Sequence, residues 1–244
     1  MRLDIFLYLN GLARSRTHAS NLVKMGMIKV NDILEFKVAR DVDIRDSIVV
    51  SNVDNYASLG GIKLKKALDY FNIDVANSIA IDIGASNGGF TDVLLKQGAK
   101  KVFAVDVSDC ALPEEIKSDE RVFVRDNLNA RSLTFEDLGI IADIITIDVS
   151  FISLKLILPA LLQFMDYKTK MIALIKPQFE VGRKHLSKSG VVLKQKITDE
   201  AVKGIIEFAK GLKLKLIGVV DSPHPFRDKN REYLAYFSKE NQTI

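Results

Sequence analysis

The stretch from Ile79 to Leu95 constrains the fold of this 244-residue chain more than any other part of its sequence. It reads Ile-Ala-Ile-Asp-Ile-Gly-Ala-Ser-Asn-Gly-Gly-Phe-Thr-Asp-Val-Leu-Leu. The short apolar run 79–83 predicts a buried parallel strand, and residues 90–95 begin a helical pattern. Three glycines lie between them. A strand, a glycine loop and a helix in this order place backbone N–H groups at a helix N-terminus, where a ligand can approach closely.

The glycine spacing and a neighbouring acid indicate what kind of ligand this loop can hold. Gly84, Gly88 and Gly89 follow the pattern G-x-x-x-G-G, which is neither the dinucleotide fingerprint G-x-G-x-x-G nor the phosphate loop G-x-x-x-x-G-K-[ST]. Asp82 lies at the edge of the loop, where a phosphate would be repelled. A ligand with positive charge and hydroxyl groups suits this acid, and S-adenosylmethionine has a sulfonium, an ammonium and a ribose. The alternative is a tight strand-to-helix turn that binds no ligand.

From residue 59 onward, apolar runs alternate with helical patterns. This βαβ rhythm predicts an α/β fold with a doubly wound, mostly parallel seven-stranded sheet and right-handed crossovers. In such sheets, ligands bind at the carboxyl ends of the strands. The expected strands are 79–83, 101–106, 122–125, 143–148, 171–176, 214–220 and 233–237, and the expected helices are 61–71, 89–97, 154–165 and 198–211.

Acidic residues lie at the ends of four expected strands: Asp82, Asp106, Asp126 and Asp148. Asp106 comes 24 residues after Asp82, a separation typical of a carboxylate that accepts hydrogen bonds from ribose hydroxyls. A helix cap can explain one acid at such a position, but four at successive strand ends predict a ligand site. A nicotinamide dehydrogenase also uses an acid at the Asp106 position, although its loop normally reads G-x-G-x-x-G.

Lys176 is the candidate for acid–base chemistry. It follows the apolar residues 173–175 and precedes Pro177, which ends the expected strand. We therefore expect a buried stem and a partly desolvated amine, and desolvation favours the neutral amine that a general base needs. A surface lysine whose amine reaches into water is the alternative. Residues 168–196 contain eight basic residues and one acid, Glu180; this suits a polyanionic substrate, and an ordinary basic loop is the alternative.

The first 50 residues follow a different pattern. Apolar spacing predicts helices over 2–10 and from Ser15 or Thr17 to about residue 25, then short β structure to residue 50 with a turn at Asn31-Asp32. Up to residue 30, five basic residues accompany the single acid Asp4, and they suit a phosphate-binding face; a solvated surface is the alternative. The five are Arg2, Arg14, Arg16, Lys24 and Lys29.

The motifs of this first segment resemble the S4 RNA-binding domain, which implies binding to structured RNA. The motifs are Arg2-Leu-Asp4, Ser15-Arg16-x-x-Ala19 and Gly26-x-Ile-x-Val-Asn31, and Asp32 stands where the S4 motif usually has glycine. The polar, aperiodic stretch 51–58 predicts a linker. We therefore expect one domain at 1–50 and a second at 59–244.

Composition excludes several classes of protein. The single cysteine, Cys110, rules out an internal disulfide and a cysteine-based metal site, and it fits a reducing cytoplasm. The net charge of +4 is weak support for nucleic-acid binding when taken alone. No stretch of 18 apolar residues predicts a membrane-spanning helix, and the N-terminus, with Asp4, does not resemble a signal peptide.

Four residues carry a resemblance that extends over the rest of the chain. Lys63, Asp148, Lys176 and Glu232 resemble, in this order, the Lys-Asp-Lys-Glu tetrad of the RrmJ/FtsJ-like ribose 2′-O-methyltransferases. Together with the S4-like segment, nearly the whole chain resembles the TlyA family of S4-domain ribosomal-RNA cytidine 2′-O-methyltransferases, historically labelled haemolysins. The supporting motifs are Gly60-Gly-x-Lys63-Leu, Asp82-Ile-Gly-Ala-Ser-x-Gly-Gly-Phe-Thr91, Asn129-Ala-Arg131, Asp148-Val-Ser-Phe-Ile-Ser153, Lys176-Pro-Gln-Phe-Glu180 and Asn230-Arg-Glu232. Leu59 and Asn87 stand where the family usually has arginine and threonine.

This resemblance implies a Rossmann-like class I methyltransferase domain that uses S-adenosylmethionine. Its substrate is expected to be a cytidine of ribosomal RNA, in 23S rRNA of the large subunit, because the end soon after Phe237 resembles the shorter form of the family. Lys176 would take or steer the 2′-OH proton while Asp148 holds it. Lys63 would orient the attacking oxygen, and Glu232 would orient Lys63 or the ribose.

The resemblance also implies where the ligands bind. The expected cofactor-binding residues are Asp82, Gly84, Ala85, Ser86, Gly88, Gly89, Phe90, Asp106, Val107, Asp126 and Asn127. The expected RNA-binding residues are the five basic residues of the first segment together with Arg183 and Lys184. We expect a cytoplasmic monomer without a metal ion and without membrane association.

Two other functions stay open at this point. The chain could be a non-catalytic RNA-binding or ribosome-assembly factor that keeps the fold, although all four residue types of the tetrad are present. A membrane-lytic haemolysin would match the historical label, but residues 1–10 lack the basic face of an amphipathic membrane anchor.

Overall fold

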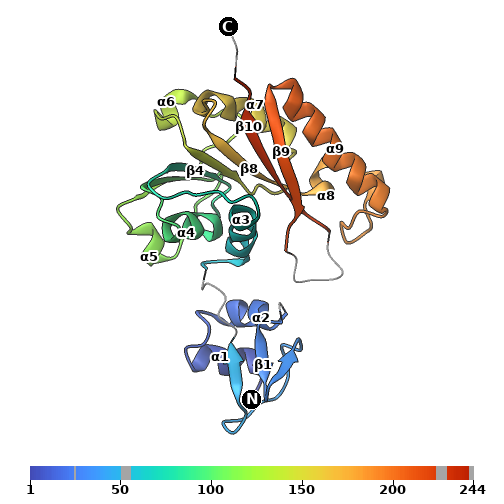
Figure 1. Cartoon of the computed structure of the whole chain (residues 1–244). Coiled ribbons are helices and arrows are strands. Elements are labelled where there is room, and N and C mark those ends of the chain that lie inside the picture. Colours follow the sequence, from blue (N-terminus) through green and yellow to red (C-terminus); the bar gives the residue numbers. More distant parts are fainter. Residues whose placement is uncertain (25, 51–55, 224–229, 242–244) are drawn as a thin grey trace. The chain divides into compact units, whose positions relative to one another are not determined.

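The computed structural model describes residues 1–24, 26–50, 56–223 and 230–241. These residues form two compact units, one comprising the described residues up to 50 and the other those from 56 onward (Figure 1). Each unit has hydrophobic clusters of its own. Part of the predicted linker, residues 51–55, lies outside the described residues, whereas Tyr56 is buried in the core of the second unit.

The first unit is a pair of helices packed with a three-stranded antiparallel sheet, whose strand order is β2-β1-β3. Its core contains the fully buried Leu3 and Leu7 from the first helix, Val23 from the second, and Ile28 from the sheet. The elements are α1 (Leu3–Leu9), α2 (Arg16–Lys24), β1 (Ile28–Val30), β2 (Ile33–Glu35) and β3 (Ile48–Val50).

Two local signals in the sequence explain the boundaries of these elements. The Ser15 hydroxyl accepts a hydrogen bond from the backbone N–H of His18 (3.1 Å), so Ser15 rather than Thr17 caps α2. Asn31 (φ 52°) and Asp32 (φ 63°) join β1 to β2 with two left-handed residues, which is the backbone of a tight hairpin turn. Asparagine and aspartate tolerate this conformation, so Asp32 can take the place of the usual glycine.

The second unit is built on a seven-stranded sheet with the order β6-β5-β4-β7-β8-β10-β9. The first five strands in this order are parallel, and β10 lies antiparallel between β8 and β9. This confirms the predicted α/β fold and its mostly parallel sheet. The strands are β4 (Ile79–Ile83), β5 (Lys101–Val105), β6 (Val122–Arg125), β7 (Ile144–Ile147), β8 (Lys170–Ile175), β9 (Leu214–Asp221) and β10 (Tyr233–Lys239).

The helical segments are more numerous than the sequence predicts. The expected helix over 154–165 consists of three short turns instead, because Pro159 has no N–H with which to continue the turn that precedes it. The segments are α3 (Leu59–Tyr70), α4 (Gly89–Lys96), α5 (Glu114–Lys117), α6 (Phe135–Leu138), the 3₁₀ turn η1 (Leu154–Leu156), α7 (Leu158–Leu161), η2 (Leu162–Phe164), α8 (Pro177–Glu180), η3 (Arg183–His185) and α9 (Gln195–Gly211).

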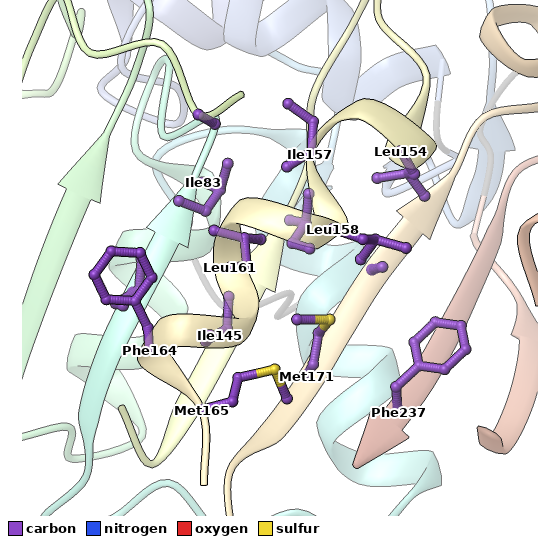
Figure 2. Packing of buried hydrophobic residues seen from close by; sticks show 14 of the residues in the cluster. Ile83, Ile145, Leu154, Ile157, Leu158, Leu161, Phe164, Met165, Met171 and Phe237 are labelled. Atoms are coloured by element: carbon purple, nitrogen blue, oxygen red, sulfur yellow. The ribbon is translucent and has the colours of Figure 1, made fainter. Parts of the chain in front are cut away.

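Hydrophobic clusters cover both faces of the large sheet. One cluster joins α9 and the three turns from η1 to η2 to one face, and Figure 2 shows Leu158, Leu161 and Phe164 packed there with Met171 and Phe237 from the strands. The other cluster joins α3 and α4 to the opposite face. Because both faces are buried, the central strands are nearly continuous apolar runs. No helix within the described residues is long and apolar enough to cross a membrane.

Candidate active site

The loop between β4 and α4 lies close to the end of β7. Gly84 has a left-handed backbone (φ 84°), and a β-carbon there would overlap the carbonyl oxygen of Asp148. A β-carbon on Gly89 would overlap the Ser58 hydroxyl, which belongs to the segment entering α3. Glycine at these two positions therefore lets three segments of the chain approach each other closely.

A cavity of about 630 Å³ opens beside this loop. Its walls come from the glycine loop, the end of β5, residues 128–131 and the segment that follows β7, with Lys176 at one side. Seven of the predicted cofactor-binding residues line it, namely Gly84, Ala85, Ser86, Gly89, Phe90, Asp106 and Val107, and so do the predicted catalytic residues Asp148 and Lys176.

Asp106 is held at the cavity wall by backbone and side-chain donors. Its Oδ2 accepts a hydrogen bond from the N–H of Ser86 (3.0 Å), and its Oδ1 accepts from the N–H (3.0 Å) and hydroxyl (2.9 Å) of Ser108. A carboxylate oxygen can accept more than one hydrogen bond. Asp106 therefore has a fixed orientation and retains capacity to accept hydrogen bonds from a ligand.

Asp82, by contrast, lies beneath the loop and does not line the cavity. Its side chain is fully buried and accepts hydrogen bonds from the hydroxyls of Thr91 (2.7 Å) and Thr146 (2.8 Å). Burial raises the pKa of Asp82 to about 6, and the nearby charge of Asp148 adds to the shift. The observed contacts make Asp82 a bridge between α4 and β7, behind the residues that face the cavity.

Three further predicted cofactor residues also lie outside the cavity wall. Gly88 (φ 76°) is the N-cap residue that directly precedes α4. Asp126 accepts a hydrogen bond from the N–H of Cys110 (2.8 Å), and Asn127 donates one to Asp109 (3.0 Å). Burial raises the pKa of the Cys110 thiol.

The four predicted catalytic residues form two ion pairs. Lys176 Nζ lies 2.6 Å from Asp148 Oδ1 and donates a hydrogen bond to the Ser150 hydroxyl (2.8 Å). Lys63 Nζ lies 2.6 Å from Glu232 Oε2. All four side chains are largely shielded from water, since the most exposed of them, Asp148, has 19% of its side-chain surface accessible.

Sheet topology brings these two ion pairs to one edge of the sheet. Tyr233 of β10 pairs with Ile175 of β8 in antiparallel register. Glu232 directly precedes Tyr233 and Lys176 directly follows Ile175, so both residues lie at the same end of this strand pair. Asp148 follows β7, the other neighbour of β8, and Lys63 reaches Glu232 from α3. Lys63 and Glu232 do not themselves line the cavity.

Comparison with known proteins now assigns the family. Residues 56–239, which include the loop, the cavity and both ion pairs, match the model of the family described as FtsJ-like methyltransferase. The chain belongs to the FtsJ-like methyltransferase family. This confirms the class of methyltransferase that the tetrad predicts.

Relatives extend the match over nearly the whole chain. A protein of Mycobacterium tuberculosis named 16S/23S rRNA (cytidine-2′-O)-methyltransferase TlyA is 38% identical over 96% of this chain and 88% of its own length. Hemolysin A of Brachyspira hyodysenteriae is 38% identical over 97% of this chain and 99% of its own. A solved structure described as a hemolysin from Streptococcus thermophilus has a TM-score of 0.76 and 36% identity, covering 99% of this chain and 89% of that one.

Several residues of the cavity wall in this FtsJ-like unit were not predicted as site residues, although some of them belong to the sequence motifs. Phe151 has a left-handed backbone (φ 64°) and 91% of its surface exposed, and its ring centroid lies 5.0 Å from that of Phe179. An exposed aromatic ring in a sparsely populated conformation is typical of a functional contact. The other unpredicted residues of the wall include Ser58, Gly60, Asn87, Ser108, Leu128, Asn129, Ala130, Arg131, Val149, Ser150 and Ile152.

Glu180 links the two segments that carry Asp148 and Lys176. Its carboxylate accepts hydrogen bonds from the hydroxyl of Ser153 and from the N–H of Leu154 (2.9 Å). Burial raises the pKa of Glu180. The motifs Asp148–Ser153 and Lys176–Glu180 are therefore joined at their far ends by Glu180 and at their near ends by the Asp148–Lys176 ion pair.

The predicted RNA-binding residues of the first unit differ in their contacts, and two of them form ion pairs with an acid. Arg2 and Arg16 both form ion pairs with the buried carboxylate of Asp4 (2.9 and 3.1 Å), so these three residues together carry one net positive charge. The hydrogen bond from Arg2 holds the pKa of Asp4 below its usual value. Lys29 is exposed on the outer side of β1, while Arg14 is hydrogen-bonded through its backbone N–H to His18. Lys24 is the last residue of α2.

Proposed function

We propose that this chain transfers a methyl group from S-adenosylmethionine to the ribose 2′-OH of a cytidine in ribosomal RNA, within 23S rRNA of the large subunit. The observation that carries the proposal is the pair of shielded lysine–carboxylate ion pairs beside the cavity. Two amines at one sheet edge, each held by an acid, supply what deprotonation and orientation of a hydroxyl require.

The cavity has the chemistry that S-adenosylmethionine needs. Its volume of about 630 Å³ is in the usual range for small-molecule sites. Asp106 can accept hydrogen bonds from ribose hydroxyls, and Ile83, Leu128 and Ile157 offer apolar walls for a base. When bound, this group supplies a methyl on an activated sulfonium, so the protein has to position and deprotonate the acceptor.

The two ion pairs suggest a division of roles at the acceptor. Lys176 accepts or steers the 2′-OH proton, and Asp148 compensates the charge of the protonated amine while Ser150 fixes its direction. Glu232 holds Lys63, whose amine donates to the ribose or to the attacking oxygen. Each lysine thus has a carboxylate partner within 2.6 Å, which fixes its geometry before RNA binds.

Ribosomal RNA as the substrate is supported by the names of the relatives and by the charged residues. We propose that residues 1–50 form an S4-like RNA-binding domain, in which the exposed Lys29 is better placed for phosphate than Arg2 and Arg16, whose charge Asp4 offsets. In the second unit, Arg183 and Lys184 are exposed and suit phosphate contacts. Phe151 offers a ring on which an unpaired base can stack.

The test uses purified protein, labelled S-adenosylmethionine and separately isolated large and small ribosomal subunits, followed by mapping of the labelled ribose. We expect a labelled cytidine in the large subunit. Lys176→Ala should reduce transfer by about 100-fold or more, a typical loss for a missing general base, while cofactor affinity stays within a few-fold. Lys203→Ala, an exposed lysine of α9, is the matched control.

The opposite results separate the alternatives. Label in no RNA, together with retained RNA binding, would favour a non-catalytic binding factor. Undiminished turnover by Lys176→Ala would remove this lysine from the mechanism.

A further inference from the structure

Three consecutive residues before β10 reach three different segments of the second unit. Glu232 binds Lys63, as described above. Arg231 forms an ion pair with Asp221 at the end of β9 (2.6 Å). Asn230 binds the segment that follows Lys176, and methyl transfer as proposed above gives this third contact no role.

The Asn230 side chain pairs with that segment as a backbone amide would. Its Oδ1 accepts a hydrogen bond from the N–H of Val192 (2.7 Å), and its Nδ2 donates one to the carbonyl oxygen of Gly190 (2.9 Å). This arrangement needs a donor and an acceptor on one short side chain. Aspartate has no donor when ionised and would place its charge against the Gly190 carbonyl.

The segment bound by Asn230 is a small hairpin, here called the basic hairpin and defined as residues 183–194. Leu186 and Val192 pair in antiparallel fashion, the N–H of Ser187 donates to the carbonyl of Val191 (2.8 Å), and Gly190 (φ 78°) forms the bend. None of its residues is buried. The ends of the basic hairpin bond to the adjoining Gly182 and to the first turn of α9. Among the described residues, Asn230 supplies the hydrogen bonds that join it to a segment distant in the sequence.

The charge of the basic hairpin is not neutralised. It contains four exposed basic residues and no acid, and none of the four makes an ion pair within the described part of the chain. Such a set suits the phosphates of a polyanion. The four residues are Arg183, Lys184, Lys188 and Lys194.

The location of the basic hairpin connects its charge to the site. It begins seven residues after Lys176, and its anchor Asn230 is two residues from Glu232. Two short stretches of chain, residues 177–182 and Arg231, therefore connect the hairpin and its anchor to the sheet edge that carries both ion pairs. A side chain that fixes the hairpin fixes the distance between bound phosphate and these ion pairs.

We propose that Asn230 is a positioning residue for the RNA substrate: it locks the basic hairpin as a phosphate-binding element in register with the Lys63–Glu232 pair. The identity of the polyanion as RNA rests on the proposed function. The lock acts on RNA and leaves the cofactor cavity unaffected, because neither Asn230 nor the basic hairpin lines that cavity.

The test compares Asn230→Asp with Asn77→Asp, using binding of purified 23S rRNA at several salt concentrations and methyl transfer at varied RNA concentration. Asn77 is an exposed residue before β4, at the opposite edge of the sheet, so its change adds the same charge away from the site. For Asn230→Asp we expect an apparent KM for RNA raised about tenfold or more, a salt slope of RNA binding lowered by about 1 to 2, and cofactor affinity within twofold. Asn77→Asp should match the wild type.

A double-mutant cycle separates positioning from a general effect on stability. Exchange of Arg183, Lys184 and Lys188 for alanine removes the cations that the lock positions. If Asn230 acts through the basic hairpin, adding Asn230→Asp to this variant causes little further loss of RNA affinity. The proposal would be overturned if the losses of RNA affinity caused by Asn230→Asp and by the alanine exchanges multiplied in the combined variant. Wild-type RNA affinity and salt slope in Asn230→Asp would overturn it too, as would a parallel loss of cofactor binding.

These outcomes are distinguishable from failure of the proposed function. Absence of methyl transfer by the wild type to any ribosomal RNA would refute that function, while the binding measurements with 23S rRNA would still decide whether Asn230 controls the basic hairpin.

Discussion

The Asp82 carboxyl is buried completely, and two threonine hydroxyls are its hydrogen-bond donors. Its folded-state pKa of about 6 is above the value of 3.8 for an exposed aspartate. The folded state therefore binds the proton more tightly than the unfolded state. The stability that results is fully present below about pH 4 and is lost as pH rises through about 6.

This shift predicts a pH-dependent difference between the wild type and Asp82→Asn, whose amide does not titrate. Relative to the variant, the free energy of unfolding of the wild type should fall by roughly 2 kcal/mol between pH 4.5 and 7.5, because the pKa is about 6 in the folded state and near 3.8 in the unfolded state. Denaturant titrations at these two pH values measure it. A difference that stays constant with pH would show that Asp82 titrates normally.

Single residues also show what the sequence could and could not predict at the site. Asp106, predicted as a ligand-binding carboxylate from its position 24 residues after Asp82, lies on the cavity wall. The same pattern does not distinguish it from Asp82, because a strand end can face either the ligand or the inside of the sheet. Phe151 lies within a motif, but its left-handed backbone and exposure depend on tertiary structure.

At the scale of elements, Glu180 at the end of α8 holds the turn η1 through Ser153 and Leu154. We expect Glu180→Ala to release the segment after β7 and displace Asp148 from Lys176, which should lower kcat about tenfold or more, since small displacements of catalytic groups are costly. Glu180→Gln can still accept from Leu154 and bond to Ser153, so it should keep most activity. Steady-state kinetics with varied S-adenosylmethionine and varied RNA gives kcat and KM for the two Glu180 variants and the wild type.

Equal kcat values for Glu180→Ala and the wild type would mean that the Asp148–Lys176 ion pair holds the segment after β7 in place without Glu180. Cofactor affinity should also fall in Glu180→Ala, because the segment after β7 is part of the cavity wall.

The elements themselves were predictable where their patterns are long and regular. All seven strands of the large sheet fall within one or two residues of the expected ranges. The central strands β4, β7 and β8 are buried apolar runs, and polar residues mark their ends. The four-residue helices α5, α6 and α8 were not expected, since one turn of helix is too short to show a period. Proline explains the broken helix after η1, and this signal was present in the sequence at Pro159.

At the scale of the whole molecule, exposed basic residues lie on both units, and the RNA proposal requires both to contribute. We expect Lys29→Ala in the first unit and Lys184→Ala in the second each to weaken binding of 23S rRNA and to lower its salt slope by about 0.9. Because the residues lie in separate units, their effects on log affinity should add. Filter binding across a salt series gives the affinity and the salt slope of the wild type, the two single variants and the double variant.

A double variant no weaker than one single variant would show that only one unit contacts RNA. The substitution Arg16→Ala would be less informative, because it also removes a partner from the buried Asp4 carboxylate.

The antiparallel insertion of β10 has a consequence for protein synthesis. β9 is made before β10, and within the described residues it pairs with β10 alone, so it joins the sheet only when β10 lies between it and β8. The residue that holds Lys63 is Glu232, at the start of that same late strand. During synthesis, most of the second unit is therefore made before the Lys63–Glu232 ion pair can form. Premature termination anywhere before residue 232 removes a strand from the interior of the sheet and the partner of Lys63 together, so an incomplete copy lacks the assembled tetrad.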